Sequence, residues 1–255
     1  MILFDFLYAM VIFYLRVLPM FLFIPLFHGN WLTNSMIKNC IIVVLGIPFL
    51  PLILPNMTQV ESRLVQSVIT EVMLGVVLAF PVALPFWIAN VAGQFLDNQR
   101  GATISSSIDP NSGVDASILA AWFNFYCCVI FVAGNGFIHI CNLLRESYVI
   151  SPPGQSLDLS LLNIVRLIGL LDLSIAKGII IISPVIITLF LSDVLLAVLS
   201  RYAPQLNPFS LSLTIKSAIA FGVLILYFTP GFQDAIQRSI NNISPLSQQL
   251  TLSNL

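Results

Sequence analysis

Charged side chains are scarce in this sequence. Among its 255 residues, 8% are charged and 58% are hydrophobic, with 10 basic and 11 acidic side chains. A soluble domain normally carries about 25% charged residues, so a soluble globule of this size would lack the polar side chains to cover its surface. Intrinsic disorder requires low hydrophobicity and high charge, which excludes it as well. The composition predicts a multi-span membrane protein, or a protein buried in an apolar assembly. A net charge of −1 provides no electrostatic footprint for nucleic acid.

Cysteine pairs and catalytic motifs are also missing. The four cysteines include no CxxC pair, which indicates core side chains rather than a disulfide framework or a metal site. Neither histidine belongs to an HExxH motif, and no P-loop, GxGxxG or GxSxG occurs. An intramembrane hydrolase is therefore an alternative without a recognisable nucleophile and base. We expect no catalytic residue, cofactor or metal. The opening MILFD has no basic n-region, so we expect the first apolar segment to stay in the mature protein.

Long apolar segments divided by short polar breaks run through the chain. Spanning helices need about 20 mostly apolar residues. Six segments are candidates: 6–27, 39–55, 72–96, 116–144, 161–200 and 209–232. Ser183-Pro184 may divide the fifth of them into two pieces, and polar loops are expected at 57–63 and 146–160. Open sheets cannot span lipid, and these segments are too continuous for a barrel, so the sequence predicts an all-α membrane protein. Basic residues fall almost evenly on the two sides, which leaves the orientation open.

Charges, prolines and small residues inside these segments predict contacts with protein. Arg16, Glu71, Asp193 and Lys216 lie in apolar surroundings, where a charge is costly unless it faces protein or a water-filled path. Arg16 and Lys216 are long enough to snorkel to the interface, whereas Glu71 and Asp193 favour buried pairing. The internal prolines predict kinked helices that need neighbouring protein. Close helix contacts are predicted at Gly75/Ala79, Ala89/Gly93 and Ala218/Gly222.

The charged residues leave two functions open. One is a set of helix-packing or inter-subunit polar contacts, formed by Arg16, Glu71, Asp97, Asp193, Arg201 and Lys216. The other is a small-solute secondary transporter that uses Glu71, Asp193 and Lys216 within the membrane. No internal repeat is detectable, which gives an inverted-repeat transporter no direct support.

A polar segment of small residues separates two uncharged segments. It reads DNQRGATISSSIDPNSGVD at 97–115, with a turn signal at Asp109-Pro110-Asn111 and a permissive Gly113. A plain surface loop is one interpretation. Such loops usually carry Lys and Glu, which are almost absent here, so a segment that lines or occludes a passage inside protein is the other.

This segment resembles the signature of the SctT family, the FliR-like export-apparatus proteins of bacterial type III secretion. The similarity continues in the family's order with LRVLPMFLFIPLF at 15–27, LPFWIANVAGQFLDNQRG at 84–101 and SPVIITLFLSDVLLAVLSRYAPQLNPFSLSLTIKS at 183–217. The DNQRGAT form is similar to the virulence, or injectisome, branch rather than the flagellar one.

The resemblance implies a non-catalytic core subunit of an export gate in the bacterial inner membrane. With SctR-like and SctS-like subunits it would form the conduit for unfolded secreted proteins, and an SctU-like switch protein would wrap the cytoplasmic mouth. Within one subunit it implies an SctR-like part at 1–160, an SctS-like helical hairpin at 161–232 and a polar tail at 233–255.

The resemblance also assigns roles to two groups of residues. Within the loop 97–117, the stretch 100–117 would act as a plug of the closed pore, through Arg100, Gly101, Ala102, Thr103, Ser105, Ser106, Ser107, Asp109, Pro110, Asn111, Gly113 and Asp115. The hairpin would turn at Pro204, Asn207 and Pro208.

Overall fold

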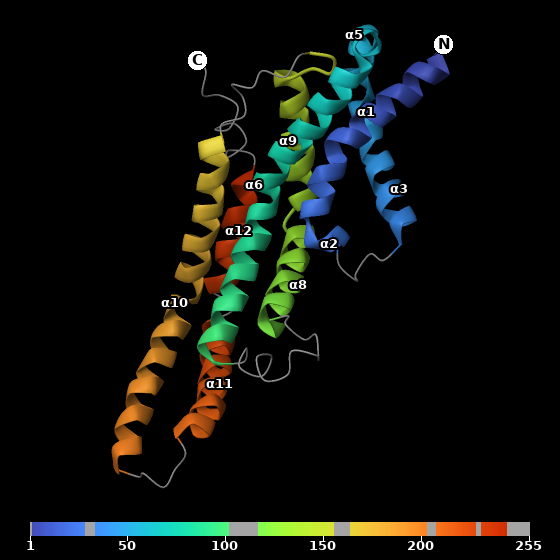
Figure 1. The fold of residues 1–255 in the computed structure, drawn as a ribbon. Coiled ribbons are helices and arrows are strands. Elements are labelled where there is room, and N and C mark those ends of the chain that lie inside the picture. The colour runs from blue at the N-terminus through green and yellow to red at the C-terminus, as the bar shows by residue number, and fades with distance from the viewer. Residues whose placement is uncertain are drawn as a thin grey trace, which may run out of the picture. The chain divides into compact units, whose positions relative to one another are not determined.

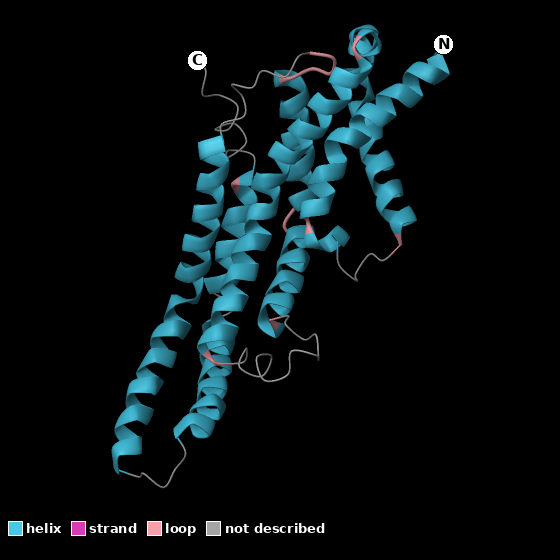
Figure 2. Cartoon of the chain, in the orientation of Figure 1, coloured by secondary structure: helices cyan, strands magenta, loops and turns pink. Residues whose placement is uncertain are grey.

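The structure of the protein is a computed structural model that describes residues 2–28, 34–101, 117–155, 164–202, 208–227 and 231–243. Throughout these ranges the chain is helical with short connections, and Figure 2 shows no strand in them. The prediction of an all-α protein with kinked helices and helical hairpins is confirmed.

The chain forms two compact units. Unit 1 contains Met1–Leu84, Phe131–Asp172 and Ser239–Leu255, and unit 2 contains Pro85–Ile130 and Leu173–Arg238. Helices α6, α8, α10 and α12 each continue from one unit into the other. The bounds of these helices are Leu64–Gln99, Ile118–Ala133, Ile164–Tyr202 and Gln233–Asn241.

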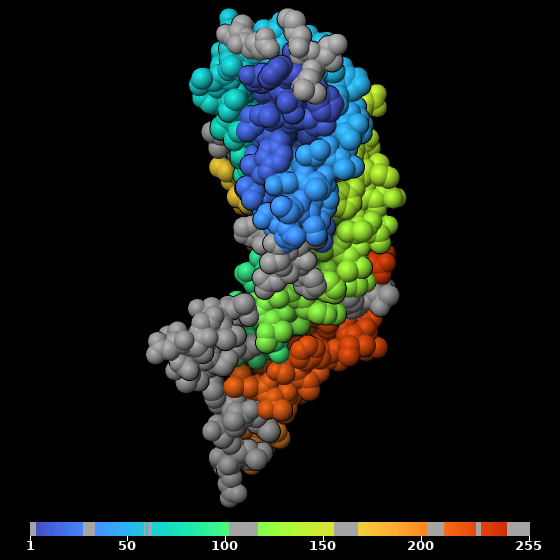
Figure 3. All heavy atoms as spheres, turned by 90° about the vertical axis from the view of Figure 1, so that its right-hand side faces the viewer, coloured from blue at the N-terminus to red at the C-terminus, as the bar shows by residue number. Residues whose placement is uncertain are grey.

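Unit 1 begins with helices that pack closely on one another. Helix α1 (Ile2–Phe23) is followed by α2 (Pro25–His28) and α3 (Ser35–Gly46). Figure 3 shows the atoms of α1 and α3 lying against each other. Gly46 makes this contact possible, because a Cβ there would lie 2.8 Å from the Phe13 ring. Phe13 in turn stacks on Phe49, with ring centroids 5.3 Å apart.

Prolines divide the next stretch into short helical pieces. They are Ile47–Phe49, α4 (Leu50–Ile53), Leu54–Asn56 and α5 (Met57–Ser62). A proline sits in the first turn of each of the first three pieces, where its missing N–H costs nothing, so each proline starts a piece instead of continuing the previous one. Helix α5 occupies most of the polar loop expected at 57–63.

Two helices extend beyond the apolar segments that predicted them. Helix α6 begins at Leu64 rather than near 72, and α9 (Gly136–Ile150) includes the first residues of the loop expected at 146–160. Helix α6 includes Glu71 in its interior, which is possible because this carboxylate is paired within the protein. Polar residues therefore marked these boundaries less well than the sequence suggested.

The apolar segment 116–144 breaks in the structure into α8 and α9. Asn135 has a φ of 62°, the left-handed region that Asn tolerates better than most residues. Gly136 follows it, and a Cβ there would lie 2.5 Å from the Phe131 ring. The chain thus turns tightly around Phe131, and a continuous hydrophobic pattern hides the break.

Unit 2 contains a helical hairpin and an additional short helix. Helices α10 and α11 (Pro208–Tyr227) form the hairpin in Figure 1, and α10 passes through Pro184 without an interruption. Helix α12 lies in the tail expected to be polar. At its start, Phe232 is buried with its ring centroid 4.7 Å from that of Phe123. Ile236 is buried as well, so the first part of the tail belongs to the packed protein.

Four described stretches are long and apolar enough to cross a membrane: Phe4–Phe23, Ser35–Asn56, Leu64–Gln99 and Ile168–Tyr202. The bent pair α8 and α9 would make a fifth if it counts as one span, and the apolar stretch Ser212–Tyr227 is shorter. The prediction of a multi-span protein is confirmed, with four or five spans among the described residues where about six were expected.

Candidate functional site

The first polar cluster lies in unit 1, where Arg16 of α1 meets Glu71 of α6. Arg16 Nε donates to Glu71 Oε2 at 2.6 Å, and Arg16 Nη2 donates to Glu71 Oε1 at 2.9 Å. Both residues have 0% of their surface exposed. A two-pronged guanidinium–carboxylate contact is among the strongest polar contacts in proteins, and it offsets part of the cost of burying two charges.

Groups at the end of α9 complete the surroundings of the guanidinium. Arg16 Nη1 donates to Ser147 Oγ at 3.1 Å, and Nη2 donates to the carbonyl oxygen of Ser151 at 3.0 Å. The Tyr148 ring lies beneath the guanidinium, with 3.8 Å between Arg16 Cζ and the ring centroid. A cation is favourable beside the carbonyl groups at a helix C-terminus. One side chain therefore joins α1, α6 and α9.

A close approach of two helices positions this pair. At Gly75 of α6, an added Cβ would lie 2.3 Å from the backbone oxygen of Arg16. Gly75 follows Glu71 by four positions and so shares its face of the helix. The absence of a side chain at Gly75 lets α1 come near enough for Arg16 to reach Glu71. The close contact predicted from this small residue is confirmed.

The second polar cluster is centred on Asp97 in unit 2, near the end of α6. Asp97 Oδ1 accepts from Arg100 Nε at 2.7 Å, and its distance to Arg100 Nη2 is 2.6 Å. Oδ2 accepts from Ser117 Oγ at 2.5 Å and from the backbone N–H of Leu119 at 2.9 Å. The Asp97 side chain is 1% exposed. Each of its oxygens is engaged by a different end of the stretch 102–116.

The start of α8 brings its own residues to Asp97. Ser117 is the N-cap of α8, since its Oγ accepts from the backbone N–H of Ala120 at 3.1 Å. A carboxylate beside the N–H groups of a helix N-terminus is stabilised by their partial positive charge. Helices α6 and α8 nearly touch here, because a Cβ at Gly93 would lie 2.3 Å from Ala120 Cα. By contrast, a Cβ at Gly222 would meet nothing within 4 Å among the described residues.

The structure describes only part of the predicted plug and turn. Arg100 and Gly101 are described at the end of α6, and Gly101 has a φ of 79°. Ten of the predicted plug residues lie outside the described residues: Ala102, Thr103, Ser105, Ser106, Ser107, Asp109, Pro110, Asn111, Gly113 and Asp115. Pro204 and Asn207 of the predicted turn also lie outside them, whereas Pro208 is the first residue of α11.

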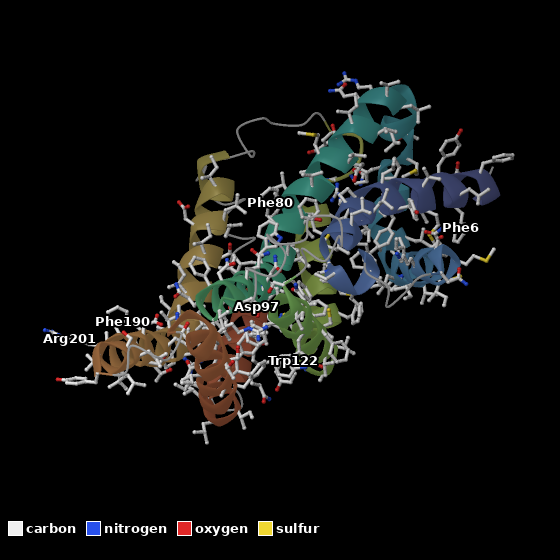
Figure 4. All side chains as sticks on the ribbon, turned by 60° about the horizontal axis from the view of Figure 1, so that its bottom comes forward. Phe6, Phe80, Asp97, Trp122, Phe190 and Arg201 are labelled. Atoms are coloured by element: carbon white, nitrogen blue, oxygen red, sulfur yellow. The ribbon has the colours of Figure 1, made fainter. Side chains whose placement is uncertain are left out.

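The third polar contact joins the two helices of the hairpin. Lys216 Nζ of α11 lies 2.6 Å from Asp193 Oδ1 of α10. Asp193 was expected to be buried, yet 44% of its side chain is exposed, so this pair is the more open of the two that link separate helices. Arg201 lies in the last turn of α10, and Figure 4 shows it together with Phe190 along this helix. Arg201 is exposed.

Sequence reasoning missed several partners of these charges. Ser117 had a recognisable signal, because a serine directly before an apolar run is a common N-cap. Ser147, Ser151 and Tyr148 had none, since the bond from Arg16 to Ser147 crosses 131 positions. Among the described residues, no group of His, Cys, Asp and Glu could hold a metal ion. The described clusters pair charges between helices and leave no carboxylate–base arrangement suited to catalysis.

Comparison with known proteins gives one family and several relatives. The model of the family described as bacterial export proteins, family 1, matches residues 7–243. The chain is 39% identical over 217 residues to the surface presentation of antigens protein SpaR of Shigella flexneri, covering 84% of this chain and 82% of that protein. It is 31% identical over 232 residues to the secretion system apparatus protein SsaT of Salmonella typhimurium, covering 88% of each. It is 28% identical over 243 residues to the Yop proteins translocation protein T of Yersinia pestis, covering 91% and 90%.

Proposed function

The chain belongs to the bacterial export proteins of family 1, the SctT- and FliR-like components of type III secretion, and on this premise we propose that it is a non-catalytic core subunit of the export gate. With SctR-like and SctS-like subunits it forms the conduit for unfolded secreted proteins at the inner membrane, and an SctU-like protein contacts its cytoplasmic mouth. The single observation that carries this proposal is the family match over nearly the whole chain, residues 7–243.

The surface of α10 supports assembly with partner subunits. Phe190 is 69% exposed, and the same face of the helix carries further exposed apolar side chains at Ile187, Leu191, Val194, Leu195 and Val198. Asp193 interrupts this apolar face with a half-exposed carboxylate. A charge there is costly against lipid alone, so a neighbouring protein helix is the better cover for at least part of the face.

The stretch 100–117 acts as the plug of the closed pore in this proposal. The resemblance of DNQRGATISSSIDPNSGVD to the family signature supports it. The Asp97 cluster supports it as well, because Arg100 and Ser117 are held by one buried carboxylate while the small-residue stretch lies between them. Short side chains allow such a stretch to move aside at low steric cost.

The two alternative functions receive less support. An ion-coupled transporter needs a carboxylate that is free to bind and release its ion, whereas both oxygens of Glu71 are engaged by Arg16. Asp193 is likewise paired with Lys216. Hydrolysis would need a nucleophile next to a base, and the described polar clusters contain neither arrangement. These clusters fit helix packing better than either activity.

Deletion of residues 101–114 tests the proposed plug. The variant is co-expressed with its SctR-like and SctS-like partners, and the purified gate is reconstituted into liposomes loaded with a small dye. We expect the deleted gate to assemble and to release the dye faster than the wild-type gate.

A matched variant separates the presence of the plug from its length. It replaces 101–114 by a glycine–serine stretch of the same length, and we expect it to leak less than the deletion because bulk is restored. An assembled deletion variant that retains the dye as well as the wild type would refute the plug assignment.

A further inference from the structure

We propose that Asp97 is the positioning residue of the plug, because its single carboxylate fixes both chain ends between which the stretch 102–116 is suspended. This inference rests on the proposed function. It concerns described residues only, namely Asp97, Arg100, Ser117 and Leu119. Asp97 sets where the stretch leaves α6 and where it returns to α8.

The upstream end is held through Oδ1 of Asp97. Arg100 Nε and Nη2 lie 2.7 Å and 2.6 Å from this oxygen, which makes the contact both a charge pair and a hydrogen bond. The Arg100 guanidinium also lies over the Phe221 ring of α11, with Cζ 5.2 Å from the ring centroid. Arg100 is therefore fixed between α6 and α11 before the chain continues to Gly101.

The downstream end is held through Oδ2. It accepts from the Ser117 hydroxyl at 2.5 Å and from the Leu119 N–H at 2.9 Å. Ser117 Oγ in turn caps α8 by accepting from the N–H of Ala120. An ordinary N-cap would need only Ser117, so the additional bonds from Asp97 bind this helix start to α6.

Burial makes the arrangement sensitive to loss of the carboxylate. Hydrogen bonds to a charged group are stronger than neutral ones, and at a site 1% exposed no water replaces them readily. An aspartate suits this position because it offers two acceptor oxygens on a short side chain. Removal of the carboxylate releases both ends together, whereas removal of either partner releases one end.

The test measures dye leak per assembled gate from liposomes for the variant Asp97→Ala. Loss of one charge-assisted hydrogen bond raises the released population, and with it the leak, roughly tenfold to a hundredfold. Ser117→Ala removes only the hydroxyl at the downstream end and gives a smaller increase. It also keeps the proposal testable if Asp97→Ala fails to assemble.

A matched control removes another bond between the same two helices. Asn124 Nδ2 of α8 donates to Asn90 Oδ1 of α6 at 3.3 Å, away from the plug ends. Asn90→Ala should lower the thermal stability of the gate without increasing its leak. An equal leak from Asn90→Ala and Asp97→Ala would show a general packing defect and overturn the positioning role.

A charge exchange separates anchoring from simple charge pairing. The double variant Asp97→Arg/Arg100→Asp restores opposite charges, but an arginine cannot accept hydrogen bonds from Ser117 and Leu119. We expect it to leak like Asp97→Ala, and a tight gate in this variant would overturn the inference.

The deletion of 101–114 serves as the reference in the same assay. If the deletion leaks while Asp97→Ala and Ser117→Ala stay tight, the inference is wrong and the plug assignment stands. If the deletion itself stays tight, the proposed plug is wrong.

Discussion

Replacing Glu71 by leucine should destabilise unit 1 strongly, because it leaves the Arg16 guanidinium buried without its counter-charge. Arg16 is fully buried, and Glu71 supplies two of the hydrogen bonds it makes. Ser147 Oγ, the Ser151 carbonyl and the Tyr148 ring remain, but none carries a negative charge. Removing one partner of a buried ion pair typically costs about 3–5 kcal/mol.

The companion variant Arg16→Met/Glu71→Leu should recover most of this loss. Apolar replacement of both partners removes both desolvation costs, and such exchanges are often close to neutral. Ser147 and Ser151 each lose a donor, which costs roughly 1 kcal/mol for each neutral hydrogen bond. Ser147 still donates to the Leu144 carbonyl at 2.7 Å, so its hydroxyl stays bonded. We therefore expect the double variant to be more stable than the Glu71→Leu single variant by about 2 kcal/mol.

Thermal unfolding of purified gates, followed by tryptophan fluorescence, measures these differences. A change of 1 kcal/mol shifts the Tm of a domain of this size by about 2–4 °C, so Glu71→Leu should lower it by roughly 6–20 °C. Asn39→Ala serves as the control, since it removes an exposed hydrogen bond to Tyr14 of the same helix α1. A double variant no more stable than Glu71→Leu, or a single variant with an unchanged Tm, would refute the reasoning.

Two further predictions concern the elements that the sequence did not reveal. Asn135 has a φ of 62°, so Asn135→Gly should preserve the Tm of the gate, whereas Asn135→Val should lower stability by roughly 1–2 kcal/mol; equal Tm values would contradict the strained turn. Ile236→Ser removes a fully buried side chain from α12 at a cost of about 2–4 kcal/mol, which should expose the region to protease. Loss of a C-terminal epitope tag during limited proteolysis measures this, and protection equal to that of the wild type would contradict the packed position of α12.

The break at Asn135 and the helix α12 show where sequence reasoning was insufficient. Gly134, Asn135 and Gly136 are adjacent turn-forming residues, but the apolar residues on both sides made the segment read as one span. In α12 the reverse occurred, because a polar composition concealed buried side chains at Phe232 and Ile236. Average hydrophobicity over a window hides both a local φ and a narrow apolar face.

The sequence by itself determined the class of the protein. Scarcity of charge requires burial of most side chains, long apolar runs require helices, and the segment 97–115 with its companions identifies the family, because each of these is a property of the chain read in order. It also indicated that charges such as Glu71 must have partners. Only the tertiary structure decided which partners they are. Arg16 and Glu71 are 55 positions apart, and the choice depends on how closely α1 approaches α6 at Gly75, which arises from packing in three dimensions.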